Sequence, residues 1–309
     1  QLRGPRRTAK GRCMKILLFG KGGQVGWELQ RSLAPLGELI ALDFDSTDFC
    51  GDFTNLQGLS EAVARVKPNV IVNAAAHTAV DKAESEPELA RALNALAPAT
   101  LAQAASACNA MMVHYSTDYV FDGSGSAPWR EADVTGPLSV YGATKLEGEQ
   151  LIAQHCAKHL IFRTSWVYAA RGGNFAKTML RLAKEKERLT VIDDQIGAPT
   201  GADLLADITA HSIRQVSQSQ KDFGLYHAVA GGQTSWHGYA EFVLSESLRH
   251  QPALSQAAKG VDPVPTSAFP TPARRPHNSR LDTQKLQTTF GLTLPHWQTG
   301  VSRMLKEIL

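Results

Sequence analysis

The sequence predicts an α/β fold, a Rossmann-type doubly wound parallel sheet with a smaller C-terminal substrate lobe. Apolar runs of strand length alternate with helical patterns from residue 14 onward, and the first run leads directly into a glycine-rich turn. The alternation weakens beyond about residue 195, where a proline-rich stretch follows at 262–276. We therefore expect a sheet domain over residues 14–195, to which later residues can add a strand, and a lobe over residues 196–309.

The first predicted strand, at residues 14–19, is apolar enough to be buried on both faces. Gly20, Gly23 and Gly26 follow it in the pattern G-x-x-G-x-x-G. One glycine permits a tight turn, one lets the backbone approach a pyrophosphate, and one lets the next helix pack closely on the strand. The N-terminus of that helix, predicted over residues 27–36, supplies amide donors and a positive dipole end for phosphates. The pattern predicts a dinucleotide-binding domain.

A second strand, predicted over residues 39–43, ends in a carboxylate. Asp43 lies roughly 20 residues beyond the glycines, where a dinucleotide site binds the adenosine ribose hydroxyls. Because an acid there favours a 2′-hydroxyl and repels a 2′-phosphate, NADH should be accepted. Lys21 could offset that repulsion, so NADPH stays open as well. A helix or turn cap is the alternative role for Asp43.

Further apolar runs continue the alternation, with an alanine-rich helix expected over residues 89–107. These runs occupy residues 70–76, 111–116, 160–165 and 189–192. In a parallel sheet, ligands bind outside the carboxyl ends of the strands. Five strand ends should therefore line one crevice, at Gly20, Asp43, Ala76, Thr117 and Ser165.

Tyr141 and Lys145 are four residues apart on a predicted helix and so share one face. A tyrosine hydroxyl has a pKa of about 10, but a fixed cation nearby stabilises the phenolate and lowers that pKa. The pair then suits proton transfer, and a hydroxyl from Thr117 could bridge Tyr141 to a substrate oxygen. The alternative is that tyrosine and lysine are ordinary residues of a solvated helix face.

Composition favours a cytoplasmic enzyme. The 309 residues are 43% hydrophobic, which suffices for one large core and a smaller lobe, and no apolar stretch approaches the roughly 18 residues of a membrane span. Residues 1–13 hold five of the 32 basic residues and no acid, which leaves 27 basic against 29 acidic residues. We expect residues 1–13 to form a disordered basic N-terminal extension, with no nucleic-acid or membrane partner. The spacing of the four cysteines matches neither a metal site nor paired disulfides, so we interpret them as reduced thiols. They are Cys13, Cys50, Cys108 and Cys156.

The chain resembles the extended short-chain dehydrogenase/reductase superfamily and, within it, the dTDP-4-dehydrorhamnose reductase family. The resemblance covers residues 14–309 and is carried by five segments in order, at residues 19–26 (Phe-Gly-Lys-Gly-Gly-Gln-Val-Gly), 73–81 (Asn-Ala-Ala-Ala-His-Thr-Ala-Val-Asp), 114–121 (His-Tyr-Ser-Thr-Asp-Tyr-Val-Phe), 163–168 (Arg-Thr-Ser-Trp-Val-Tyr) and 272–276 (Pro-Ala-Arg-Arg-Pro). It implies the last step of dTDP-L-rhamnose synthesis, reduction of the C4 ketone of dTDP-4-dehydro-β-L-rhamnose by NADPH or NADH. It also implies a homodimer and a bacterial envelope polysaccharide, such as the O-antigen of lipopolysaccharide, as the destination of the sugar.

The resemblance also implies residue roles. Tyr141 would protonate the C4 oxygen, Lys145 would lower the pKa of Tyr141 and hold the nicotinamide ribose, and Thr117 would bond the same oxygen. The implied cofactor-binding residues are Gly20, Gly23, Gln24, Val25, Gly26, Asp43, Asp52, Phe53, Ala76, His77, Thr78, Tyr115, Tyr141 and Lys145. The implied substrate-binding residues are Thr117, Asp118 and Trp166, and an implied Mg²⁺ site between subunits uses Glu28, Asp203 and Glu307.

Several of these residues have simpler interpretations. Trp166 could be core packing, and His77 and His114 could be hydrogen-bonded structural histidines. Arg274 and Arg275 could clamp the dTDP diphosphate with their guanidinium forks, or could tie down the proline-rich segment by salt bridges.

Two rival functions stay open at this point. A nucleotide-sugar epimerase with bound NAD shares the glycine turn and the Tyr-x-x-x-Lys pair, whereas the related 4,6-dehydratases carry Asp-Glu where this chain has Asp118-Tyr119. A non-catalytic regulatory subunit of the methionine adenosyltransferase type has a similar fold. Intact Thr117, Tyr141 and Lys145 argue against loss of catalysis. Cofactor exchange would separate the first rival, and co-purification with a transferase the second.

Overall fold

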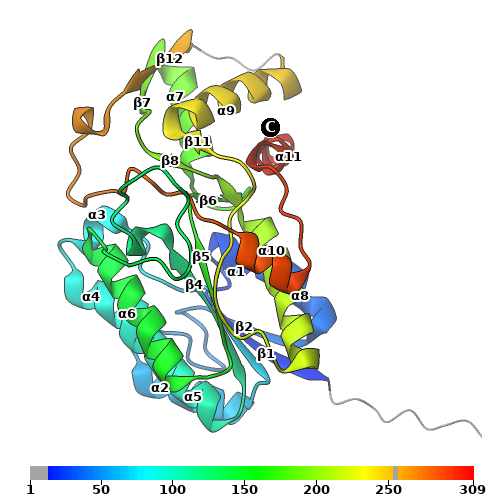
Figure 1. The fold of residues 1–309 in the computed structure, drawn as a ribbon. Coiled ribbons are helices and arrows are strands. Elements are labelled where there is room, and N and C mark those ends of the chain that lie inside the picture. The colour runs from blue at the N-terminus through cyan, green and yellow to red at the C-terminus, as the bar shows by residue number, and fades with distance from the viewer. Residues whose placement is uncertain (1–12, 253–256) are drawn as a thin grey trace, which may run out of the picture.

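The computed structural model describes residues 13–252 and 257–309, so the predicted N-terminal extension lies outside the described residues except for Cys13. Its centre is a six-stranded sheet in the order β10-β5-β4-β3-β1-β2, in which every pair of neighbours is parallel (Figure 1). The strands are β1 (Met14–Phe19), β2 (Gly37–Leu42), β3 (Val70–Asn73), β4 (Met111–Thr117), β5 (His159–Thr164) and β10 (Gly224–His227). The predicted α/β fold with a doubly wound parallel sheet is confirmed.

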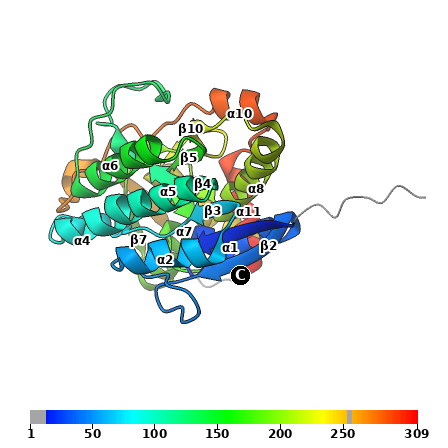
Figure 2. The same cartoon turned by 90° about the horizontal axis from the view of Figure 1, so that it is seen from below.

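Helices cover both faces of this sheet. Alternate side chains of β1 point to opposite faces, so Leu17 and Phe19 belong to one core and Ile16 and Leu18 to the other. The first core is closed by α2 (Leu56–Val66), α5 (Ala97–Ala107) and α6 (Val140–His155), which Figure 2 shows as one layer. The second core is closed by α1 (Gln24–Leu33), α8 (Ala202–Ser219) and α10 (Gln284–Phe290).

The helix predicted over residues 89–107 is three helical segments in succession. A single π-helical turn, Ala92–Leu96, joins α4 (Pro87–Arg91) to α5, and α3 (Val80–Ala83) precedes them. Pro98 has no N–H and cannot bond the carbonyl of Asn94, which helps to explain the irregular turn. Gly148 of α6 lies against that carbonyl, and a Cβ there would collide with it. The irregular turn therefore lets α6 approach closely.

The smaller lobe draws on segments from both sides of residue 195 (Figure 1). Its core joins α7 (Phe175–Glu185) and β7 (Arg188–Ile192) to α9 (Trp236–His250) and α11 (Trp297–Ile308), and β7 pairs with β12 (Gly260–Val264). Two-residue strands pair as β6 (Val167–Tyr168) with β9 (Thr200–Gly201) and β8 (Ile196–Gly197) with β11 (Thr234–Ser235). Short 3₁₀ helices lie at Ala34–Leu36, Asp118–Val120 and Thr266–Ala268. Both α8 and β10 come after residue 195, yet they pack with the large sheet. The division into domains at residue 195 therefore stays a prediction.

The cysteines and the helices bear on two further expectations. Cys13, Cys50, Cys108 and Cys156 are all free thiols in the described structure. None of the helices in residues 13–252 and 257–309 combines the length and the apolarity that crossing a membrane requires.

Candidate active site

The carboxyl ends of the central strands open into one cleft of about 590 Å³. The five predicted strand-end residues, Gly20, Asp43, Ala76, Thr117 and Ser165, all line it. Trp236, from the start of α9 in the smaller lobe, lines it too. The cleft therefore lies where the sheet edge meets the smaller lobe, the usual position for a ligand site in this architecture.

The three glycines of the turn have different surroundings. Gly20 has φ +83°, and a Cβ there would press on the backbone of Ala75, while a Cβ at Gly26 would collide with the carbonyl of Gly20. Gly23 is open, because a Cβ there would lie 3.5 Å from its nearest neighbour, the Gly20 oxygen. Gly20 and Gly26 are thus needed for packing, whereas Gly23 keeps space free beside the N-terminus of α1, where Gln24 and Val25 line the cleft.

Asp43 braces the glycine turn from the end of β2. Its Oδ2 accepts a hydrogen bond from the Gly22 N–H at 2.9 Å, and its Oδ1 accepts one from the Phe44 N–H at 3.1 Å. The carboxylate also borders the cleft. It is therefore both a turn cap and a group that faces the predicted ribose position.

Four residues predicted to bind the cofactor do not line this cleft: Gly26, which packs against the Gly20 carbonyl, and Asp52, Phe53 and His77. Asp52 accepts hydrogen bonds from both the N–H and the hydroxyl of Thr54, and Phe53 is buried edge-on against Phe19. His77 donates its backbone N–H to Asn94 at 2.8 Å, and its ring Nε2 lies 3.6 Å from a carboxylate oxygen of Glu86. Ala76 and Thr78, its neighbours, do line the cleft. The His77 ring thus lies outside the cleft, and its Nδ1 is buried without a hydrogen-bond partner among the described residues.

Thr117, Tyr141 and Lys145 meet in the cleft, as predicted. Thr117 ends β4, while Tyr141 and Lys145 lie on successive turns of α6, whose first turn is capped by the Ser139 hydroxyl. Burial raises the pKa of Tyr141 to about 12, against the lowering effect of a hydrogen bond with Thr117. In the absence of cofactor the phenol is thus protonated near neutral pH, and the expected lowering of its pKa by Lys145 is not seen.

Lys145 is buried beneath Tyr141. Its Nζ donates to the carbonyl of Tyr115 at 2.6 Å and lies 3.2 Å from Nε2 of His114. Burial lowers the pKa of Lys145 to about 8, and the charge of Glu149 opposes that effect. Tyr115 itself lines the cleft, and its hydroxyl shares a hydrogen bond with Thr209.

Buried polar groups lie along the wall of the cleft. The hydroxyls of Ser116 and Thr164 are buried, line the cleft, and have no hydrogen-bond partner among the described residues. Burial raises the pKa of Asp118 to about 6, against hydrogen bonds with Ser279 and Thr117, and the Thr117 hydroxyl lies 3.1 Å from the Asp118 Oδ1. Such groups suit a polar ligand.

Trp166 forms an aromatic stack at the rim of the cleft. It has φ +50°, an uncommon value for a non-glycine residue, and its ring lies parallel to that of Trp236 with centroids 3.7 Å apart. Trp236 Nε1 donates to Gln195 at 3.1 Å. Both rings line the cleft, but only Trp166 was predicted, because Trp236 lies in no recognisable motif.

The predicted metal ligands Glu28, Asp203 and Glu307 share a separate hollow of about 250 Å³. Glu28 pairs with Arg31 and Asp203 with Arg303, each at 3.3 Å. Within residues 13–252 and 257–309, no group of three or more acidic, histidine or cysteine side chains is arranged to hold an ion. The magnesium site thus stays a prediction.

Arg275 acts as a tie for the proline-rich segment. It bonds both carboxylate oxygens of Asp81, at 3.1 and 2.7 Å. Asp81 also accepts the backbone N–H of Ala273 at 3.2 Å. These contacts agree with the interpretation in which Arg275 holds the proline-rich segment by a salt bridge. The neighbouring Arg274 is exposed.

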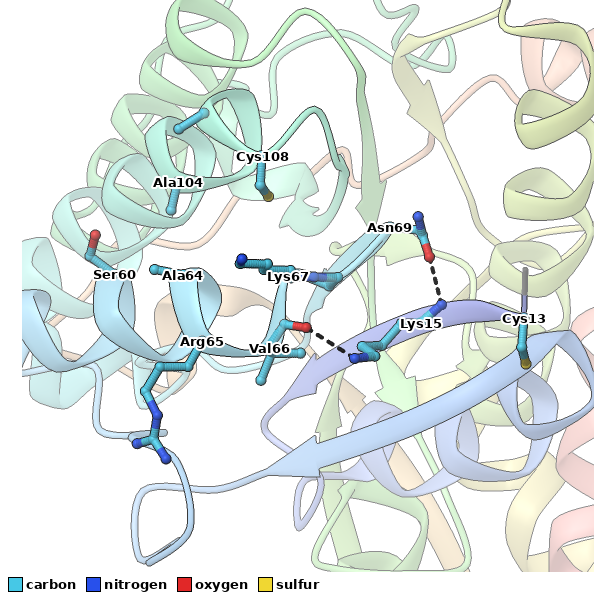
Figure 3. Close-up of a pocket in the computed structure, with 12 residues that line it drawn as sticks. Cys13, Lys15, Ser60, Ala64, Arg65, Val66, Lys67, Asn69, Ala104 and Cys108 are labelled. Atoms are coloured by element: carbon cyan, nitrogen blue, oxygen red, sulfur yellow. Dashed lines mark hydrogen bonds between the residues drawn. The ribbon is translucent and has the colours of Figure 1, made fainter.

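A larger hollow, of about 770 Å³, lies at the opposite end of the sheet between β1, α2 and α5 (Figure 3). Lys15 closes one side through its backbone N–H, which donates to Asn69 at 2.8 Å, and its Nζ, which donates to the Val66 carbonyl at 3.2 Å. None of the predicted site residues lines it. The chemistry of the chain is concentrated in the smaller cleft.

Known proteins resemble this chain over nearly its whole length. A family model described as "RmlD substrate binding domain" matches residues 14–309. The dTDP-4-dehydrorhamnose reductase of Shigella flexneri is 63% identical over 295 residues, which cover 96% of this chain and 98% of that protein. The dTDP-4-dehydrorhamnose reductase of Salmonella typhimurium is 62% identical with the same coverage.

Solved structures agree. A dTDP-4-dehydrorhamnose reductase from Clostridium acetobutylicum superimposes with a TM-score of 0.85 at 37% identity, covering 96% of this chain and 99% of that one. One from Bacillus anthracis, in complex with NADP, gives 0.84 at 33% identity and covers 96% and 100%. A Thermus thermophilus UDP-glucose 4-epimerase in complex with NAD gives 0.76 at 18% identity, covering 96% and 100%, a similarity of fold alone.

Proposed function

The chain belongs to the dTDP-4-dehydrorhamnose reductase family, and from that premise we propose how its residues carry out the reaction. It is an NAD(P)H-dependent oxidoreductase of dTDP-rhamnose synthesis, which reduces the C4 ketone of dTDP-4-dehydro-β-L-rhamnose. Relatives above 60% identity are reductases, whereas the epimerase similarity is at 18%, so the reductase is favoured over both rivals. The observation that carries the proposal is the meeting of Thr117, Tyr141 and Lys145 in one cleft.

The residues present fit a nicotinamide dinucleotide. Gly23 leaves room beside the N-terminus of α1, so the amides of Gln24 and Val25 can bind the pyrophosphate, and Asp43 can accept hydrogen bonds from the adenosine ribose. Lys145 and Tyr115, further along the cleft, suit the nicotinamide end. When bound, the dinucleotide supplies the hydride.

Tyr141 is proposed to be the general acid. Reduction places negative charge on the C4 oxygen in the transition state, so a proton donor aimed there stabilises the transition state more than the ground state. A phenol whose pKa is raised to about 12 holds its proton near neutral pH, as a donor must. Thr117 would bond the same oxygen, and a charged Lys145 would stabilise the phenolate left behind.

Asp118 and Trp166 are proposed to hold the dTDP-linked sugar. Both line the cleft beyond Thr117, and Trp166 offers an aromatic face fixed by its stack with Trp236. An aromatic face suits either a thymine base or the apolar side of a sugar ring.

We also propose a cytoplasmic homodimer with a divalent ion at its interface. Free thiols support the cytoplasm, and the shared hollow of Glu28, Asp203 and Glu307 supports an ion site that a second copy completes. Light scattering after gel filtration, with and without EDTA, tests this: a dimer that EDTA weakens is expected, and a monomer in both conditions would contradict it.

The reaction itself is tested by stoichiometry. With dTDP-4-dehydrorhamnose and NADPH or NADH, we expect one dinucleotide oxidised and one dTDP-L-rhamnose formed per substrate consumed. An epimerase would interconvert sugars without net oxidation of added dinucleotide. A protein that binds dinucleotide but converts no sugar would support the regulatory alternative.

A further inference from the structure

Three buried polar side chains form a line behind the cleft, from β3 through β4 to α6. Asn73, His114 and Lys145 are 1%, 1% and 2% exposed. Asn73 Nδ2 lies 3.0 Å from His114 Nδ1, and His114 Nε2 lies 3.2 Å from Lys145 Nζ. Since the three groups are largely shielded from water, a donor of one group that faces another needs an acceptor there.

At the Asn73 end of this line, a backbone N–H determines which side-chain atom accepts and which donates. The N–H of Ala75 can only donate, and it donates to Asn73 Oδ1 at 2.9 Å. This orients the amide, so the Nδ2 of Asn73, which also can only donate, faces His114. His114 Nδ1 must therefore accept. A neutral imidazole has one N–H, so the ring proton of His114 is on Nε2, facing Lys145.

A charged Lys145 cannot satisfy this arrangement. Its ammonium has no acceptor site, so it would place a donor 3.2 Å from the His114 Nε2–H. An uncharged amine accepts that hydrogen bond through its lone pair, donates one N–H to the Tyr115 carbonyl at 2.6 Å, and keeps a second N–H. We propose that, in the cofactor-free protein, His114 is a positioning residue that favours the uncharged amine of Lys145 over its ammonium.

Burial favours the uncharged form of Lys145, whereas the nearby acid Glu149 opposes it. On α6, Tyr141 and Glu149 lie one turn before and one turn after Lys145, but Glu149 is paired with Arg163 of β5 at 2.9 and 2.7 Å. Asp118, beyond Thr117, lies in the same cleft. Burial lowers the pKa of Lys145 to about 8 and holds the pKa of His114 well below its ordinary range, so a doubly protonated imidazole is disfavoured as well.

This inference deepens the proposed function, because that function requires a positive charge on Lys145 during the reaction. Above about pH 8, Lys145 is mostly uncharged without cofactor, so the charge must arrive with the dinucleotide. Binding of NADH at such a pH should then take up a proton from solvent onto the Lys145 amine. In that pH range, His114 would make the cation appear mainly in the loaded site.

The tautomer can be read directly by long-range ¹H–¹⁵N NMR of histidine-labelled protein without cofactor. Because the chain has 10 histidines, the signal of His114 is assigned by its loss in His114→Gln. We expect protonated Nε2 and unprotonated Nδ1. A ¹³Cε-lysine titration, with Lys145→Met for assignment, should show Lys145 titrating near pH 8. A protonated Nδ1, or a Lys145 that stays charged to pH 10, would overturn the proposal.

Asn73→Asp is the matched variant and keeps the shape of the side chain. One carboxylate oxygen still accepts from Ala75, and the other accepts from His114, so the ring proton should move to Nδ1 and the Lys145 titration should shift to higher pH. A tautomer unchanged from wild type would contradict the direction assigned to Asn73. If His114→Gln does not fold, the signal that changes in Asn73→Asp identifies His114.

Calorimetry in two buffers of different ionisation enthalpy separates this inference from the proposed function. At pH 8.5, NADH binding should take up a substantial fraction of one proton in wild type and none in Lys145→Met. An uncharged Lys145 in the NMR titration without proton uptake would uphold the role of His114 and refute the cationic role of Lys145. A lysine charged before binding would overturn the inference and leave the proposed function intact.

Discussion

Arg163 of β5 and Glu149 of α6, the helix that carries Tyr141 and Lys145, form a buried bidentate ion pair. Arg163 Nε and Nη2 donate to the two carboxylate oxygens of Glu149 at 2.9 and 2.7 Å, and the side chains are 4% and 5% exposed. Glu149 lies one turn beyond Lys145 on α6, and the Arg163 guanidinium lies over the ring of Phe121 with its carbon 5.0 Å from the centroid. The pair therefore links α6 to β5 one helical turn from Lys145.

Removing one partner of this pair should be costly. Glu149→Gln leaves the charge of Arg163 buried and uncompensated, so we expect a loss of about 3–5 kcal/mol in the free energy of unfolding, measured by urea denaturation. Glu147→Gln is the matched control on the same helix, because Glu147 pairs with Arg91 at the surface and should matter far less. Equal losses in the two variants would contradict the role given to burial.

The glycine turn makes two substitutions behave differently. Gly23→Val should fold, because the position is open, but should lose dinucleotide binding since the side chain fills the space left for the pyrophosphate. Gly26→Ala should be destabilised instead, because its Cβ would collide with the Gly20 carbonyl. Thermal unfolding and NADH titration of both variants check the distinction. Normal NADH affinity in Gly23→Val would remove the pyrophosphate from this turn.

Asp118 gives the protein a characteristic dependence on pH. Burial raises its pKa from 3.8 to about 6, so the folded state binds this proton more tightly than the unfolded state does. The stability from this group is full below pH 4 and falls as the pH rises to about 6. Asp118→Asn should therefore gain on the order of 2–3 kcal/mol relative to wild type between pH 4 and pH 7. A constant difference across that range would show that Asp118 is not perturbed.

Trp236 should affect substrate binding more than the chemical step. Trp236→Ala removes the ring that stacks on Trp166, and such a stack contributes about 0.5–1.5 kcal/mol, so the KM for the sugar nucleotide should rise about 2- to 10-fold while kcat changes little. Phe269→Ala, at an exposed aromatic residue outside the cleft, serves as the control. A fall in kcat at unchanged KM would give Trp236 a different role.

The local sequence pattern was enough to predict the positions of the site residues that lie at strand ends. Gly20, Asp43 and Thr117 were placed in one cleft because parallel strands bring their carboxyl ends to one edge, and the spacing of Tyr141 and Lys145 put both on one helix face. These predictions depend only on residues close together in the sequence and on the regular geometry of strands and helices.

Contacts between distant segments could not be derived in this way. His77 follows β3 as expected, but its ring lies beside Glu86 and not in the cleft, and its backbone N–H bonds Asn94. Trp236 reaches the cleft only because α9 packs in the smaller lobe, and strand β10 returns to the sheet after α8. His114 was expected to be structural, and only the orientation of Asn73 indicates which of its nitrogens carries the proton.

The role of Tyr141 as proton donor is best tested by the loss of absorbance at 340 nm with dTDP-4-dehydrorhamnose and NADPH or NADH, for wild type beside Tyr141→Phe. We expect turnover in wild type and a kcat lower by a factor on the order of 10²–10⁴ in the variant, with NADH binding nearly unchanged. Turnover in Tyr141→Phe equal to that of wild type would contradict the assignment of Tyr141 as the proton donor.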